Sequence, residues 1–105
     1  MINVTQILQR IKSSVHATDP GATLILYGSY ARGDQREDSD IDILVLLDKD
    51  KITYDDRKRI GSPLYHIELE TDTLISPRIF SKKIWETKYK ITPLYKNVTI
   101  EGKPL

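Results

Sequence analysis

Apolar residues near the start of the chain recur at the spacing of an α-helix. They are Val4, Ile7, Leu8, Ile11 and Val15. Residues three and four positions apart share one face of a helix, so this spacing predicts an amphipathic helix over residues 3–16. The apolar face of such a helix needs a partner, and we expect it to cover one face of a β-sheet.

Two short apolar runs follow, with the length and the boundaries of strands. Residues 23–27 (TLILY) lie between Pro20-Gly21 and Gly28, and residues 40–47 (DIDILVLL) follow a polar loop. Apolar runs of this length between turn residues are typical of buried strands. We therefore predict a strand in each of the two segments.

The middle of the chain begins with a helix and then allows two interpretations. Thr53 is a suitable N-cap for a helix that starts at Tyr54. In residues 61–71, apolar and polar residues alternate, as they do in a strand with one polar face. If this segment is a strand, its polar face would lie beside the two metal-binding aspartates described below, and Glu68 would be the third metal ligand.

The alternative for residues 61–71 is a helix. Ile60, Leu64 and Ile67 have helical spacing, and Ser62-Pro63 could form the cap and first turn of this helix. We favour the helix, because residues 73–80 begin with a good strand sequence and would supply the third strand.

Two more helices are predicted towards the C-terminus. Ser81 should cap a helix that runs through Tyr89, and Thr92-Pro93 should start the last helix, with Gly102 beyond its end. All these elements predict one α/β domain over residues 1–105. It would contain a small mixed sheet of about three to four strands, with helices packed on one face.

The turn after the first predicted strand, residues 28–33 (GSYARG), suggests a phosphate site. Gly28 has no Cβ, so its backbone can approach a ligand closely. Ser29 can cap a short helical turn whose free N–H groups face an anion, and Gly33 can end that turn. Arg32 lies one turn from Ser29 and could neutralise phosphate charge. We therefore assign nucleotide binding to Gly28, Ser29 and Arg32.

Two carboxylates begin the second predicted strand. Because side chains alternate along a strand, Asp40 and Asp42 share one face, with Cα atoms roughly 6–7 Å apart. Mg²⁺ prefers oxygen ligands and usually takes one or two carboxylates together with water and substrate phosphates. The pair therefore predicts a magnesium site beside the phosphate turn, as needed to bind a nucleoside triphosphate such as ATP.

The spacing Gly28-Ser29, ten residues, Asp40-x-Asp42 resembles the minimal nucleotidyltransferase domain of the DNA polymerase β superfamily. The resemblance is specific over residues 23–47 and looser beyond them. It implies a nucleotidyltransferase fold in which the glycine-serine turn binds the triphosphate and the two aspartates bind the metal. Members of this family often act as the antitoxin of a toxin–antitoxin pair, some by transferring AMP to the partner toxin.

The resemblance also raises a question about a third metal-binding carboxylate. The family position for this group aligns with Ser76, and a serine hydroxyl supplies no negative charge. If the third strand extends far enough, Asp72 is the nearest carboxylate on the same face. The provisional catalytic residues are therefore Asp40, Asp42 and Asp72.

Two classes of function follow. The first is a Mg²⁺-dependent nucleotidyltransferase that moves NMP, most simply AMP from ATP, to a hydroxyl of a protein or small molecule. The second is a catalytically weak or inactive binding module that uses the same fold as an antitoxin towards a helical protein partner. The absence of a clear third carboxylate favours the second class, and the phosphate turn with its aspartates favours the first.

Composition and charge limit the kinds of binding partner and the cellular location that we expect for this protein. The 105 residues are too few for a polymerase with separate subdomains, and the absence of cysteine excludes disulfides and thiolate metal sites. Residues 1–77 carry a net charge of −4 (9 basic and 13 acidic residues), whereas residues 78–105 carry +5 (7 basic and 2 acidic). The basic segment lacks the interleaved aromatic residues of nucleic-acid binders. Without an apolar membrane segment, we expect a cytoplasmic protein, and the oligomeric state stays open.

Overall fold

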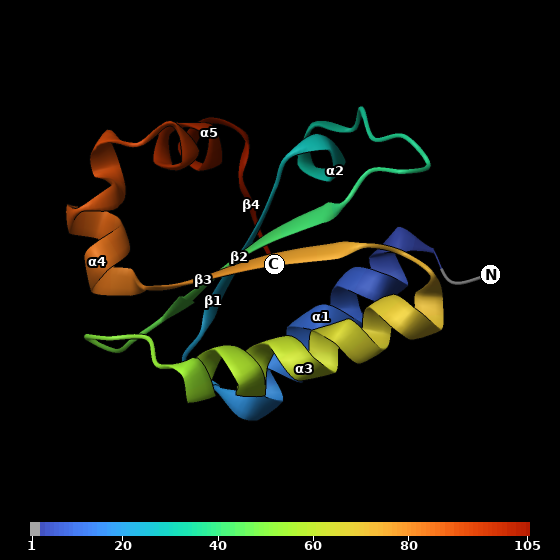
Figure 1. Cartoon of the computed structure of the whole chain (residues 1–105). Coiled ribbons are helices and arrows are strands. Elements are labelled where there is room, and N and C mark those ends of the chain that lie inside the picture. Colours follow the sequence, from blue (N-terminus) through green and yellow to red (C-terminus); the bar gives the residue numbers. More distant parts are fainter. Residues whose placement is uncertain (1–2) are drawn as a thin grey trace.

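The computed structural model describes residues 3–105, which form a four-stranded mixed sheet and its covering helices (Figure 1). The strands are β1 (Thr23–Tyr27), β2 (Ile41–Leu47), β3 (Ile75–Ser81) and β4 (Lys103–Pro104), in the spatial order β3-β2-β1-β4. β2 pairs antiparallel with β1 and parallel with β3, and β4 pairs antiparallel with β1. The predicted mixed sheet is therefore confirmed.

Helices α1 (Val4–Thr18) and α3 (Tyr54–Thr71) lie side by side against one face of the sheet (Figure 1). Alternate residues of β2 point into this layer and are fully buried, namely Ile41, Ile43, Val45 and Leu47. They pack with the apolar stripes of the two helices, namely Ile7, Ile11, Val15, Ile60, Leu64 and Ile67. The predicted first helix and its role as a cover for the sheet are confirmed.

The C-terminal helices cover part of the opposite face of the sheet. They form a second helical layer, in addition to the single layer expected from the sequence. They are α4 (Lys82–Thr87), a 3₁₀ turn η1 (Tyr89–Ile91) and α5 (Pro93–Glu101). The other side of β2 packs here, where Leu44 and Leu46 contact buried Trp85 and Val98. The Ser81 and Thr92 side chains accept the predicted capping hydrogen bonds, although α4 ends earlier than predicted.

Helix α3 is continuous, so a second helix starting at Ser62-Pro63 was a wrong prediction, whereas helical structure through Thr71 is confirmed. Pro63 lies inside the helix, where a missing N–H and a steric clash typically cost roughly 3 kcal/mol. Ile60, Leu64 and Ile67 are all buried, and each such side chain contributes roughly 1.5–3 kcal/mol. Packing of one unbroken apolar stripe therefore outweighs the defect at Pro63.

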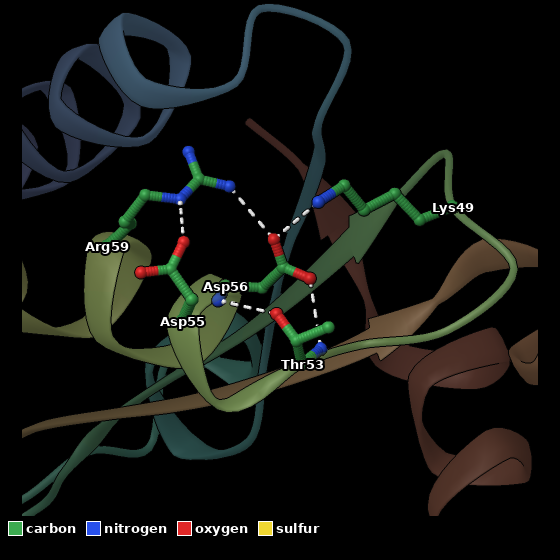
Figure 2. A network of polar contacts seen from close by, with 5 residues as sticks. All are labelled: Lys49, Thr53, Asp55, Asp56 and Arg59. Atoms are coloured by element: carbon green, nitrogen blue, oxygen red, sulfur yellow. Dashed lines mark hydrogen bonds and ion pairs between the residues drawn. The ribbon is translucent and has the colours of Figure 1, made fainter.

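The start of α3 is fixed by a polar network around a buried carboxylate (Figure 2). Asp56 is only 1% exposed, and it accepts hydrogen bonds from Lys49 Nζ, Arg59 Nη2 and the Thr53 backbone N–H. The Asp56 N–H in turn donates to the Thr53 hydroxyl, which completes a capping box. The predicted Thr53 cap is confirmed, and the network joins the loop after β2 to the helix.

Replacing Asp56 by asparagine should lower the melting temperature at neutral pH by roughly 10 °C, because two cations lose their buried partner. The Lys49 ammonium, with the Thr53 and Arg59 hydrogen bonds, holds the pKa of Asp56 well below its usual range. The stabilisation is therefore present above the unfolded-state pKa of about 3.9 and is lost as pH falls below it. Urea unfolding of both proteins at pH 7 and pH 3 should show a smaller difference at pH 3, and an equal difference would contradict this account.

The length and polarity of the helices decide whether any of them could cross a membrane. Within residues 3–105, every helix is either too short or too polar to span a lipid bilayer. The cytoplasmic location expected from the sequence remains a prediction.

Candidate active site

The turn between β1 and α2 (Ser29–Arg32) has an unusual backbone conformation. Gly28 has φ 76° and ψ −159°, a region that essentially only glycine occupies, and Gly33 ends the short helix with φ 80°. The N-cap is Gly28 rather than the predicted Ser29, and it makes no side-chain capping bond. Its carbonyl instead accepts the N–H groups of Ala31 and Arg32, at 3.0 and 3.1 Å. The serine hydroxyl is therefore not used to cap the helix.

The structure brings the turn and one predicted metal ligand into direct contact. Tyr27 pairs with Asp42 across β1 and β2, so the next residue, Gly28, lies beside the Asp42 side chain. A Cβ added to Gly28 would overlap Asp42 Oδ2 and would lie 3.2 Å from Asp42 Cγ. The glycine thus makes room for the carboxylate, and the two parts of the sequence motif form one site.

The electrostatics of this site indicate a deficit of positive charge. Burial and then repulsion by Asp40 raise the pKa of Asp42, while Arg78 and Arg32 oppose the rise. Asp40 is exposed and immediately precedes β2. Burial and the nearby Asp42 charge likewise raise the pKa of the Tyr27 hydroxyl. Two mutually repelling carboxylates at one end of a strand would be stabilised by a cation.

A divalent cation such as Mg²⁺ fits this pair better than a metal with an all-protein coordination sphere. Within residues 3–105, His, Asp and Glu side chains form no group of three or more that could hold a metal ion. Mg²⁺ commonly binds one or two carboxylates and completes its octahedron with water and substrate phosphates. Asp40 and Asp42 therefore suit an ion that arrives with a nucleotide.

The structure places Ser76 where the family resemblance implies a third metal-binding carboxylate. Ser76 pairs directly with Asp42 in the parallel register of β2 and β3. β3 begins at Ile75, so the predicted extension of this strand to residue 73 was wrong. Asp72 is instead the exposed C-cap of α3, with φ 52°, because the helix must reverse direction before the strand begins. Glu68 lies in α3 and accepts the N–H of Ile75 at 2.8 Å.

One acidic residue of the site was not identified from the sequence. Glu101 Oε2 accepts a hydrogen bond from Arg32 Nη1 at 2.6 Å, and its side chain is only 15% exposed. Arg32 Nε also donates to Asp34 Oδ2 at 3.1 Å. Glu101 further contributes to the raised pKa of Asp42, which places its charge within reach of the aspartates. A signal was present in the sequence, since an acid at the end of a helix opposes the helix dipole.

A second concave surface lies away from these groups. It has a volume of about 810 Å³ between α1 and α3, and its lining includes Gln6, Arg10 and His66. It contains no carboxylate, whereas phosphate and metal chemistry needs the charged groups around Gly28 and Asp42. We therefore place the candidate active site at the latter position.

Comparison with known proteins identifies the family of this chain. A family model described as a nucleotidyltransferase domain matches residues 5–105. The chain belongs to the nucleotidyltransferase family. This finding confirms the resemblance noted in the sequence and supports the prediction of an enzyme that transfers a nucleotidyl group.

Two curated relatives of this nucleotidyltransferase come from Methanocaldococcus jannaschii. One, named "Putative protein adenylyltransferase MJ0141", is 35% identical over 85 residues, covering 79% of this chain and 85% of the relative. The other, "Putative protein adenylyltransferase MJ0604", is 37% identical over 94 residues, covering 78% of this chain and 75% of the relative. Both names specify adenylyl transfer to a protein.

Solved structures support the nucleotidyltransferase fold. A structure described as a minimal nucleotidyltransferase has a TM-score of 0.62 and 24% identity, and covers 99% of this chain and 97% of that one. A toxin–antitoxin crystal structure with AMP-PNP has a TM-score of 0.61 and 23% identity, and covers 98% of this chain and 72% of that one. At this level of identity, the two likenesses show the shared fold.

Proposed function

We propose that this nucleotidyltransferase transfers NMP, most simply AMP from ATP, to a hydroxyl group of a protein or small molecule in a Mg²⁺-dependent reaction. The observation that carries the proposal is the contact between Gly28 and the Asp42 carboxylate, because it joins the phosphate turn to the metal ligands. The names of the curated relatives support adenylyl transfer in particular.

Each residue of the site has a proposed role. Gly28 and Ser29 would bind the β- and γ-phosphates at the turn, Asp40 and Asp42 would hold Mg²⁺, and Arg32 would bind phosphate charge. When bound, Mg²⁺ would neutralise phosphate oxygens and polarise the α-phosphate. Alignment of the nucleotide by the turn and electrostatic stabilisation by Arg32 would lower the barrier. Asp72 remains only a prediction as the third catalytic carboxylate, because it lies at the C-cap of α3 and outside β3.

The chemical step breaks one phosphoanhydride bond of the nucleotide and forms one phosphoester bond to the acceptor. The acceptor hydroxyl oxygen forms a bond to the α-phosphorus, while the bond from this phosphorus to the bridging oxygen breaks and pyrophosphate leaves. The hydroxyl proton passes to a carboxylate of the aspartate pair, which acts as general base.

A protein acceptor is supported by a surface outside the site. Ile91 and Ile100, at 93% and 73% exposure, lie near Lys90 and Lys96 on the C-terminal helices. Exposed apolar residues with basic neighbours suit a protein partner. The toxin–antitoxin structure with the same fold leads us to propose a helical, toxin-like partner.

A second candidate function is a weakly catalytic or inactive antitoxin that acts by binding alone. The specific observation in its favour is Ser76, which stands opposite Asp42 where the family resemblance implies a third carboxylate. In this case the same C-terminal surface would bind the partner without a transfer step.

Transfer of labelled nucleotide separates the two functions. The protein is incubated with Mg²⁺ and the product of the neighbouring gene, using ATP labelled in either the α- or the γ-phosphate. For the enzyme, we expect the acceptor to become labelled with α-labelled ATP but not with γ-labelled ATP, and pyrophosphate to be released. Stable binding of the partner without label or pyrophosphate would support the binding module.

A further inference from the structure

Arg32 is held from two sides by acidic residues. Its Nε donates to Asp34 and its Nη1 donates to Glu101, so the planar guanidinium is fixed in orientation. Within residues 3–105, its Nη2 makes no hydrogen bond. The hydrogen bonds of Nε and Nη1 therefore define the position of the guanidinium, while the N–H groups of Nη2 remain available to an anion.

Glu101 reaches this position through the C-terminal strand. Lys103 of β4 pairs with Leu26 of β1 in an antiparallel register. Two residues back from Lys103 is Glu101, and two residues on from Leu26 is Gly28. The short strand thus places the end of α5 at the level of the phosphate turn.

Local electrostatics disfavour an acid at this position. Glu101 is the last residue of α5, where the helix dipole repels negative charge, and it lies near Asp42, whose pKa it helps to raise. It is also mostly buried. A residue that opposes local preferences is expected at a functional site, and Arg32 is the basic group to which it is hydrogen-bonded.

We propose that Glu101 is a positioning residue that orients the Arg32 guanidinium for the phosphates of the nucleotide. This inference rests on the proposed function, because it assumes that a nucleotide binds at the Gly28 turn. Glu101 itself would touch neither nucleotide nor metal. Its effect on binding would pass entirely through Arg32.

A double-mutant cycle tests the proposal, with calorimetric binding of Mg²⁺–AMP-PNP as the measurement. Arg32→Ala and Glu101→Ala should each raise Kd about tenfold, the scale expected for loss of one charge-assisted contact. The double variant should also lose about tenfold rather than a hundredfold, because both changes remove the same contact. Glu101→Gln retains an oxygen acceptor for Arg32 Nη1 and should recover most of the affinity.

Arg10 and Glu70 provide a matched control. Their ion pair has the same 2.6 Å distance and joins α1 to α3, away from the site. Glu70→Ala should leave Kd unchanged. Thermal unfolding of every variant separates lost stability from lost binding, and Glu101→Gln keeps the test valid if Glu101→Ala folds poorly.

The possible outcomes are distinct. Wild-type affinity in Glu101→Ala, tighter binding by this variant, or multiplicative losses in the double variant would each overturn the positioning role while leaving the proposed function standing. Failure of the wild type to bind Mg²⁺–AMP-PNP would overturn the proposed function and this inference together. Equal, non-additive losses with an unaffected Glu70→Ala control support the proposal.

Discussion

Replacing Asp42 by asparagine is expected to reduce nucleotidyl transfer at least about a thousandfold, equivalent to roughly 4 kcal/mol of transition-state stabilisation. Asparagine has the size of aspartate, so the space beside Gly28 and the pairing with Tyr27 can be kept. The change removes the charge that, together with Asp40, would hold the metal ion, and it removes a candidate general base. Pyrophosphate release in the presence of the acceptor and Mg²⁺ measures the loss.

The same substitution should not lower stability. Because burial and Asp40 raise the pKa of Asp42, the folded state disfavours its ionised form at neutral pH. The neutral side chain of Asp42→Asn should therefore give an unchanged or higher melting temperature, as often found for catalytic residues. Asp48→Asn, an exposed acid beyond the other end of β2, is the control and should retain transfer. Full activity of Asp42→Asn would contradict the proposed site.

Much of the fold could be predicted because its signals are local. The first helix, β1 and β2 follow from apolar patterns within fifteen residues or fewer, and the structure confirms them. The capping residues Thr53, Ser81 and Thr92 each act on an N–H three residues later, so sequence alone could locate these helix starts.

The wrong predictions lie where packing decides between local alternatives. Pro63 is a common first-turn residue, and only the apolar stripe shared with α1 explains why α3 continues through it. Asp72 was expected on the same face as Ser76, just before the third strand, but a left-handed C-cap is needed there to connect α3 to β3. Ser29 could have been a cap, yet the extreme conformation of Gly28 starts the helix one residue earlier.

In the candidate site too, local features could be predicted from the sequence and long-range contacts could not. The turn and the aspartates are close in sequence and belong to paired strands, so their meeting could be predicted from alternation and spacing. Glu101 is 69 residues from Arg32, and their contact depends on β4, a two-residue strand without a recognisable pattern. Long-range partners of this kind become visible only when the sheet order is known.

Replacing Gly28 by alanine should impair both folding and nucleotide binding. A side chain at φ 76° and ψ −159° costs about 1–3 kcal/mol, and the new Cβ would also overlap Asp42 Oδ2. The carboxylate must move, or the turn must change shape, and either response separates the phosphate turn from the metal ligands. We expect a lower melting temperature and at least a tenfold weaker affinity for Mg²⁺–AMP-PNP, measured by thermal unfolding and calorimetry.

Gly33→Ala is the matched control, because it separates backbone strain from the overlap with Asp42. Gly33 also has a positive φ, of 80°, but an added Cβ would meet no heavy atom within 4 Å. This variant should lose about 1–2 kcal/mol of stability from the left-handed conformation and keep most of its nucleotide affinity where it remains folded. If Gly28→Ala and Gly33→Ala weaken nucleotide binding equally, strain alone explains the effect. The contact between Gly28 and Asp42 would then have no special part in binding, because only one of the two glycines lies against the carboxylate.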